Sequence, residues 1–263
     1  MRLALGLEYD GRGYAGWQHQ GHARAVQTVV EEALGRVANH PVRVTAAGRT
    51  DSGVHATLQV IHFDTEVERS PRGWMLGTNS NLPPDVAVQW VLPVAAEFSA
   101  RRSALARTYR YLIDNRLPRP ALGHGRVTWE RRPLDALRMH AAAQALVGEH
   151  DFSAFRALSC QASSATRRVD VARVWREGEL LQFEIRANAF LHHMVRNIVG
   201  SLLEIGAGEQ AEGWVATLLA ARDRAVAGAT ARPDGLYLID VEYPAEFGLP
   251  RGHRGLPPDG ASP

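Results

Sequence analysis

The first residues of the chain alternate between apolar and polar positions, the pattern of a β-strand with one buried face. The apolar side of this strand would carry Leu3, Leu5, Leu7 and Tyr9. A glycine-rich loop follows over residues 10–21. Apolar residues then recur three or four positions apart over residues 26–37. This spacing predicts an amphipathic helix that packs on the strand.

Later segments repeat the same two patterns. Short apolar runs predict strands over residues 42–46, 54–63, 86–92, 108–113, 169–175, 180–187 and 236–241. Helical spacing predicts helices over residues 134–146, 189–205 and 214–221. Several connections between strands are too short to hold a crossover helix, so we expect a mixed, mainly antiparallel sheet rather than a doubly wound parallel one.

These elements predict an α+β protein built from two similar lobes, each with helices flanking its part of the sheet. The lobes are expected to meet near residue 100, with an N-terminal lobe over residues 1–100 and a C-terminal lobe over residues 101–245. Residues 246–263 are rich in proline and glycine. We expect this tail to be weakly ordered.

Composition narrows the class of protein. With 263 residues, 45% apolar and 22% charged, the chain is neither disordered nor fibrous. It has no run of 18 apolar residues and its N-terminus lacks a signal-peptide core, so we expect neither a membrane protein nor a secreted one. The single cysteine, Cys160, cannot form an intramolecular disulfide, which favours a reducing cytoplasm.

The positive charge is uneven along the chain. All 30 basic residues are arginine, and ten of them lie between Arg101 and Arg138 against only three acidic residues. We call this segment the arginine block. Such a block suggests a surface that binds a polyanion such as RNA. A solvated surface without a binding role explains the charge equally well.

The densest polar cluster on a predicted loop is Gly48-Arg49-Thr50-Asp51-Ser52-Gly53. Glycines at both ends permit unusual backbone angles and close approach of a ligand. In an extended stretch, Arg49 and Asp51 point to the same side. The pattern fits a catalytic carboxylate, and it also fits a tight turn in which Asp51 caps backbone N–H groups while Arg49 forms a surface ion pair.

Two further segments carry candidate binding residues. As a helix, residues 188–200 would place His192, His193 and Arg196 beside an apolar stripe, and an arginine there needs a carboxylate or phosphate partner. Adjacent histidines diverge on a helix, so metal binding is not favoured. On the strand around residue 110, Tyr109 faces away from the neighbouring arginine. It fits a base-stacking surface or a core position equally well.

Short motifs recur along the chain in a fixed order. They are Tyr14-x-Gly16-Trp17-Gln18-x-Gln20, Gly48-Arg49-Thr50-Asp51-x-Gly53-Val54-His55-Ala56, Asn79-x-Asn81-Leu82-Pro83, Phe98-x-Ala100-Arg101, Tyr109-Arg110-Tyr111, Asp151-Phe152-x-x-Phe155, residues 188–200 and Gly235-Leu236-Tyr237-Leu238. Together, over roughly residues 1–245, they resemble the tRNA pseudouridine synthase A (TruA) family.

The resemblance implies a fold, an activity and a set of site residues. The fold is the pseudouridine synthase fold of two α+β lobes. The activity is the isomerisation of uridine to pseudouridine at positions 38, 39 and 40 of the tRNA anticodon arm, without metal or cofactor. Asp51 stands where the family has its catalytic aspartate, Tyr109 where it has the active-site tyrosine, and Arg196 where it has the arginine that pairs with the aspartate. Arg49 is the basic position of the signature.

The resemblance further implies a cytoplasmic homodimer whose partner is tRNA and neither DNA nor a membrane. Two rival classes are a noncatalytic RNA-binding module and a nucleoside hydrolase. The module has no need for an acid framed by glycines. The hydrolase would use a carboxylate cluster to hold a metal or activate water, and its small substrate does not require the arginine block.

Overall fold

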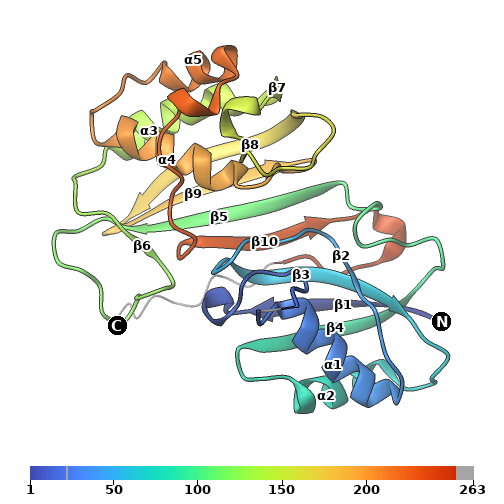
Figure 1. The fold of residues 1–263 in the computed structure, drawn as a ribbon. Helices are drawn as coiled ribbons and strands as arrows, with labels where there is room; N and C mark the ends of the chain where they lie inside the picture. Colours follow the sequence, from blue (N-terminus) through green and yellow to red (C-terminus); the bar gives the residue numbers. More distant parts are fainter. Residues whose placement is uncertain (22, 253–263) are drawn as a thin grey trace. The chain divides into compact units, whose positions relative to one another are not determined.

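A computed structural model describes residues 1–21 and 23–252 of the chain, which form two compact units (Figure 1). The first unit contains Met1–Ala106 and the described residues from Tyr237 onward, and the second contains Arg107–Leu236. The predicted boundary near residue 100 lies close to Ala106, but the chain also returns to the first unit after residue 236. Of the predicted tail, Phe247 packs on Phe98 with ring centroids 5.1 Å apart, and residues 253–263 lie outside the described residues.

The first unit is built on a mixed, mainly antiparallel sheet. Its strands are β1 (Arg2–Tyr9), β2 (Thr45–Ala46), β3 (His55–Asp64), β4 (Val86–Val94) and β10 (Leu236–Glu242). Their order is β4-β1-β3-β10, with β2 paired to β3. All the pairs are antiparallel except β3 with β10, whose register places His55 opposite Tyr237.

Strand β1 is buried on both faces, not on one as its alternation predicts. Leu3, Leu5 and Leu7 are buried as expected, but Ala4 is also fully buried. Gly6 packs so closely against the Trp90 indole that a Cβ on Gly6 would lie 2.2 Å from the indole nitrogen. The middle of the second face is therefore covered because Ala4 and Gly6 are small, while Arg2 and Glu8 at its ends are only partly buried.

Helices α1 (Val26–Ala38) and α2 (Pro71–Asn81) lie on the same side of β1 and β4 (Figure 1). Helix α1 matches its predicted range closely. Helix α2 has no counterpart in the prediction because only Trp74 and Thr78 on it are buried, so it lacks a clear apolar stripe. Its start does carry a signal, since the Ser70 hydroxyl accepts from the N–H of Gly73 and a proline follows the cap.

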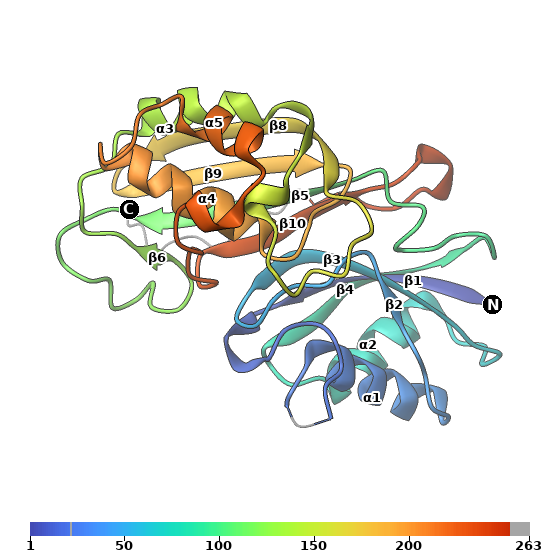
Figure 2. The same cartoon turned by 45° about the horizontal axis from the view of Figure 1, so that its top comes forward.

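The second unit has a similar construction. Its strands are β5 (Ala106–Asp114), β6 (Thr128–Trp129), β7 (Gly148–Asp151), β8 (Thr166–Glu177) and β9 (Leu180–Ala187). The order is β5-β9-β8-β7, all antiparallel, with β6 parallel to β5. The helices are α3 (Ala136–Ala143), α4 (Met194–Gly206) and α5 (Trp214–Ala221), which Figure 2 shows together on one side of β8 and β9. Both units are thus α+β, as the sequence predicts.

Helix α4 begins later than its periodicity predicts. It starts at Met194, and His193 before it has a left-handed backbone with φ 60°. The side chain of Asn188 accepts from the N–H groups of Arg168 and Ala189. These bonds hold residue 188 in a turn directly after β9, so residues 188–193 form a loop instead of the first turns of the helix.

Within residues 1–21 and 23–252, none of the helices combines the length and the apolar character that a membrane span requires.

We expect Gly200→Ala to destabilise the protein by about 1–3 kcal/mol, because a Cβ on Gly200 of α4 would lie 1.7 Å from the carbonyl oxygen of Ala229. The gain in helix propensity from glycine to alanine is only about 1 kcal/mol, so the clash dominates. Chemical unfolding followed by circular dichroism measures the change. Gly213→Ala is the matched control, since nothing lies within 4 Å of that added Cβ. A stability of Gly200→Ala equal to that of the control would contradict the close packing.

Candidate active site

The predicted site residues lie in both units. Asp51 and Arg49 belong to the first unit, on the loop over residues 47–54 that leads into β3; we call it the signature loop. Tyr109 lies on β5 and Arg196 on α4, both in the second unit. Each unit therefore contains two of the four residues.

Backbone hydrogen bonds hold the signature loop to the loop after β1. The carbonyl of Thr50 accepts from the N–H of Trp17 at 3.0 Å, and the N–H of Gly53 donates to the carbonyl of Tyr14 at 3.2 Å. The N–H of Val54 donates to the carbonyl of Asp51 at 3.1 Å, which closes a turn within the loop. Asp51 is therefore presented, half-buried, from a backbone that is fixed on both of its sides.

Glycines make this close contact of two loops feasible. Gly16 has φ +101°, and a Cβ there would lie 2.7 Å from the carbonyl oxygen of Thr50. A Cβ on Gly11 would lie 2.0 Å from the carbonyl oxygen of Val54. Gly53 has φ +78°, a left-handed conformation that favours glycine. Close backbone approach is thus made by glycines of the loop after β1 to the signature loop of the same unit. The approach of a ligand to Gly48 and Gly53 stays a prediction.

Buried side chains of β1 and β3 form hydrogen bonds with the signature loop. The Tyr9 hydroxyl lies 2.8 Å from the Thr50 hydroxyl, and the amide nitrogen of Gln59 donates to the carbonyl of Gly48 at 2.7 Å. Burial raises the pKa of Tyr9 to about 12, against smaller opposing effects of its hydrogen bond with Thr50 and of the nearby Gln59 side chain. Tyr9 is therefore neutral at physiological pH and keeps its hydroxyl proton.

Asp10 anchors the start of the loop after β1. Partial burial acts to raise its pKa, but hydrogen bonds from His55 and Arg12 outweigh burial and hold the pKa well below its ordinary range. His55 itself is buried and stacks on Tyr237, with ring centroids 4.6 Å apart. Its Nδ1 lies 3.3 Å from Oδ1 of Asp10 and 3.1 Å from the backbone nitrogen of Gly11. The charged carboxylate of Asp10 thus ties the first loop to the residue that follows the signature loop.

In the second unit, Tyr109 packs edge-on against Phe190 with ring centroids 4.9 Å apart. The predicted division of the strand is confirmed, since Tyr109 and Tyr111 are buried while Arg110 lies opposite Glu184 and pairs with it at 2.7 Å. Tyr111 has a core role: its hydroxyl bonds the Thr128 hydroxyl and the carbonyl of Arg232. The two tyrosines of the motif therefore have different surroundings.

Arg196 is half-buried and its position is set by a neighbouring segment, residues 224–231. Its Nε donates to the carbonyl of Ala231 at 2.8 Å, and the N–H of Ala231 donates back to the carbonyl of Arg196. The side chain of Asn197 next to it is fully buried and accepts from the Thr230 hydroxyl at 2.7 Å. This segment and α4 form one hydrogen-bonded assembly.

Ion pairs offset part of the positive charge of the arginine block in the structure. Four of its arginines pair with carboxylates of the same unit: Arg110 with Glu184, Arg116 with Asp114, Arg132 with Glu130 and Glu209, and Arg138 with Glu212. Three of these acids lie outside the block along the chain, so counting charges within the block overlooked them. Arg119, Arg126 and Arg131 are exposed and suit contact with a polyanion better.

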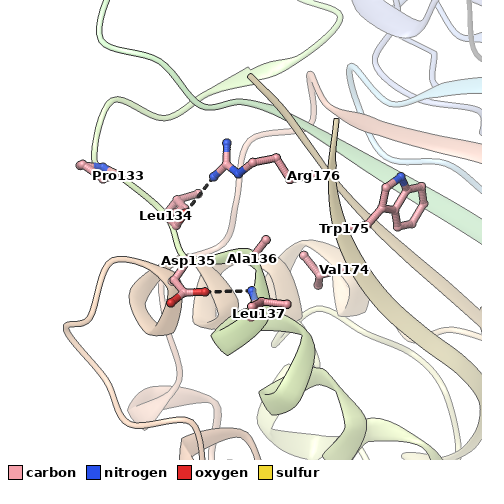
Figure 3. A pocket seen from close by; sticks show the side chains of 9 residues that line it. Pro133, Leu134, Asp135, Ala136, Leu137, Val174, Trp175 and Arg176 are labelled. Carbon is pink, nitrogen blue, oxygen red and sulfur yellow. Dashed lines mark hydrogen bonds between the residues drawn. The ribbon is translucent and has the colours of Figure 1, made fainter. Parts of the chain in front are cut away.

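A cavity of about 750 Å³ lies at the start of α3, away from the predicted residues. Figure 3 shows its polar groups already engaged within the chain: Arg176 donates to the carbonyl of Leu134, and Asp135 accepts from the N–H of Leu137. None of the four predicted site residues lines it. Its size alone therefore does not make it a candidate for the chemistry.

Comparison with known proteins identifies the family. A family model described as tRNA pseudouridine synthase matches residues 7–101 and 142–244. Proteins named tRNA pseudouridine synthase A from Xanthomonas oryzae pv. oryzae (strain PXO99A) and Nitrosococcus oceani are 58% and 56% identical over 252 and 251 residues. The matches cover 95% of this chain and 98% and 97% of those proteins. Among solved structures, a chain of a Cbf5-Nop10-Gar1 complex superposes with a TM-score of 0.33 and 12% identity, over 76% of this chain and 54% of that one, which is too low to add to the argument.

The chain therefore belongs to the tRNA pseudouridine synthase family, isomerases that act on tRNA. The resemblance found in the sequence is confirmed. Sequence reasoning named Asp51 but overlooked the residues that hold its loop, Tyr9, Asp10 and Gln59. Tyr9 and Gln59 resemble ordinary strand residues in the sequence, and only their distance from the signature loop in space shows their role.

We expect Asp10→Asn to lower the melting temperature at pH 7, with the difference shrinking as the pH falls below about 4. The pKa of Asp10 is depressed in the folded protein from its ordinary 3.8, so its charge stabilises the fold above that value and the contribution is lost as the pH falls toward the folded pKa. Thermal unfolding across a pH series measures this. Exposed Glu32→Gln is the control. An Asp10→Asn difference that stays constant from pH 7 to pH 3 would refute the role of the charge.

Proposed function

We propose that this protein isomerises uridine to pseudouridine at positions 38, 39 and 40 of the tRNA anticodon stem-loop, and that the Asp51 carboxylate is its catalytic group. The observation that carries the proposal is the fixed backbone of the signature loop. Thr50 before Asp51 is held by Trp17, and Gly53 after it is held by Tyr14. A catalytic carboxylate needs such a defined position, because misplacement by about 1 Å is costly to the rate.

The chemistry requires one carboxylate and no added reactant. The bond between N1 and C1′ of the uridine breaks, the uracil turns, and a bond forms between C5 and C1′. The hydrogen on C5 leaves as a proton and N1 takes up a proton, so that the product is an isomer of uridine. A carboxylate can attack C1′ as a nucleophile, or it can stabilise positive charge there and then accept the C5 proton. Both routes use Asp51 in its ionised form.

We assign Tyr109, Arg49 and Arg196 to substrate binding. The target base lies within a stem or loop, so it must be flipped out before it can react, and an aromatic ring such as Tyr109 can stack on it. Arg49 is exposed on the signature loop, where a guanidinium can meet a phosphate. The hydrogen bonds between Arg196 and Ala231 support the assignment of Arg196, because they orient the rest of its side chain.

The proposal extends to the setting of the reaction. We propose that the protein acts in the cytoplasm as a homodimer, with tRNA as its partner and neither DNA nor a membrane involved, and that no metal or cofactor takes part. The single cysteine supports a reducing compartment. The exposed arginines of the arginine block support contact with RNA phosphates.

We expect Asp51→Asn to reduce turnover by several orders of magnitude while tRNA affinity changes by less than about tenfold, roughly 1.4 kcal/mol. The substitution keeps the size and polarity of the side chain but removes its charge and nucleophilicity. Single-turnover assays and filter binding with the same tRNA measure the two quantities. Glu32→Gln, at an exposed position on α1, is the control and should keep its turnover within a few-fold. Substantial turnover by highly purified Asp51→Asn would remove Asp51 from the mechanism.

We expect tritium placed on uracil C5 to appear in water when transcripts carry uridine only at positions 38 to 40, because forming the new C5–C1′ bond expels that hydrogen. Free uridine should release none, since it lacks the phosphates that position the substrate. Release only from the D or T arm would overturn the proposed positions. Free uracil in place of tritiated water would indicate a nucleoside hydrolase, and binding without either product would indicate an RNA-binding module.

A further inference from the structure

The buried residues that hydrogen-bond to the signature loop include polar groups that a purely structural core does not need. Gln59 is fully buried on β3, and its side-chain oxygen has no hydrogen-bond partner among the described residues. An unsatisfied buried acceptor costs free energy that an apolar side chain of similar size would avoid. What Gln59 does supply is the 2.7 Å bond from its amide nitrogen to the carbonyl of Gly48.

Tyr9, at the end of β1, is a second buried polar residue that hydrogen-bonds to the signature loop. Its ring is buried, and its hydroxyl lies beside the hydroxyl of Thr50, which is itself only 6% exposed. The carbonyl of Thr50 is held separately by the N–H of Trp17, whose ring packs against that of Tyr9 with centroids 6.0 Å apart. Thr50 is thus fixed through its side chain and its main chain, and it is directly followed by Asp51.

We propose that Tyr9 is a positioning residue for the reaction: its hydroxyl holds Thr50, and with the Gln59–Gly48 bond it fixes the backbone that presents Asp51. Tyr9 acts through Thr50 and does not contact the substrate. This inference rests on the proposed role of Asp51. It goes beyond that role because it assigns the geometry of the site to a buried hydroxyl outside the loop.

Removing the Tyr9 hydroxyl tests the inference. We expect Tyr9→Phe to lower kcat about tenfold while KM and tRNA affinity stay within about twofold, because the carboxylate is still present but less well aimed. Thr50→Val should have the same effect, and Thr50→Ser, which keeps the hydroxyl, should restore most of kcat. The double variant of Tyr9→Phe and Thr50→Val should be no slower than the slower single variant, because each change removes the same hydrogen bond between the two hydroxyls.

Tyr243→Phe is the matched control. Tyr243 is a buried tyrosine of the same unit whose hydroxyl donates to the carbonyl of Ala100 at 2.6 Å, away from the signature loop. Both phenylalanine variants should lower the melting temperature to a similar extent, but only Tyr9→Phe should lower kcat. Equal kcat values for the two variants would show that Tyr9 merely stabilises the fold and would overturn the inference.

Asp51→Asn, assayed in parallel, separates this inference from the proposed function. If Asp51→Asn is inactive while Tyr9→Phe and Tyr243→Phe both keep full kcat, the catalytic assignment stands and the positioning role fails. If Asp51→Asn keeps its activity, the catalytic assignment itself fails, and the positioning role fails with it. A loss of kcat in Tyr9→Phe and Thr50→Val, with Thr50→Ser and Tyr243→Phe active and Asp51→Asn inactive, supports both.

Discussion

Close contact between two backbone segments of the first unit is the constraint on which the candidate site depends. The loop after β1 and the signature loop approach so closely that Gly11 and Gly16 have no room for a side chain. Hydrogen bonds then join the two segments through the carbonyls of Tyr14 and Thr50. Because the contact is between main chains, the position of Asp51 follows from the backbone and from very few side chains.

The second unit holds its own candidate residue by the same kind of contact. Gly200 lies against the carbonyl of Ala229, and Arg196 exchanges hydrogen bonds with Ala231. Buried Asn197 joins α4 to that segment through the Thr230 hydroxyl and to the carbonyl of Phe155. In both units a glycine permits the close approach of two segments, and hydrogen bonds then join them.

The arginines of this protein serve the fold as well as its surface. Arg110 and Arg173 both pair with Glu184 and lie over the ring of Trp175, so two guanidinium groups share one carboxylate and one indole. A planar guanidinium can donate to a carboxylate and stack on a ring at once, which an ammonium group does less well. Arginine content by itself is therefore a poor measure of the surface available to RNA.

The sequence by itself determined the class of fold and the protein family, and it predicted the residues of the candidate site. Regular spacing of apolar residues predicted α1, α5 and β9 closely, because such spacing directly reflects which face of an element is buried. The signature loop was found because its glycines and Asp51 are adjacent along the chain. Only the tertiary structure showed that both faces of β1 are buried, that residues 188–193 form a loop before α4, and that β10 belongs with the first unit. It alone showed that Tyr9 and Gln59 hydrogen-bond to the signature loop. It also showed that acidic residues outside the arginine block pair with arginines of the block. These features depend on contacts between residues far apart in the chain, which local spacing does not encode.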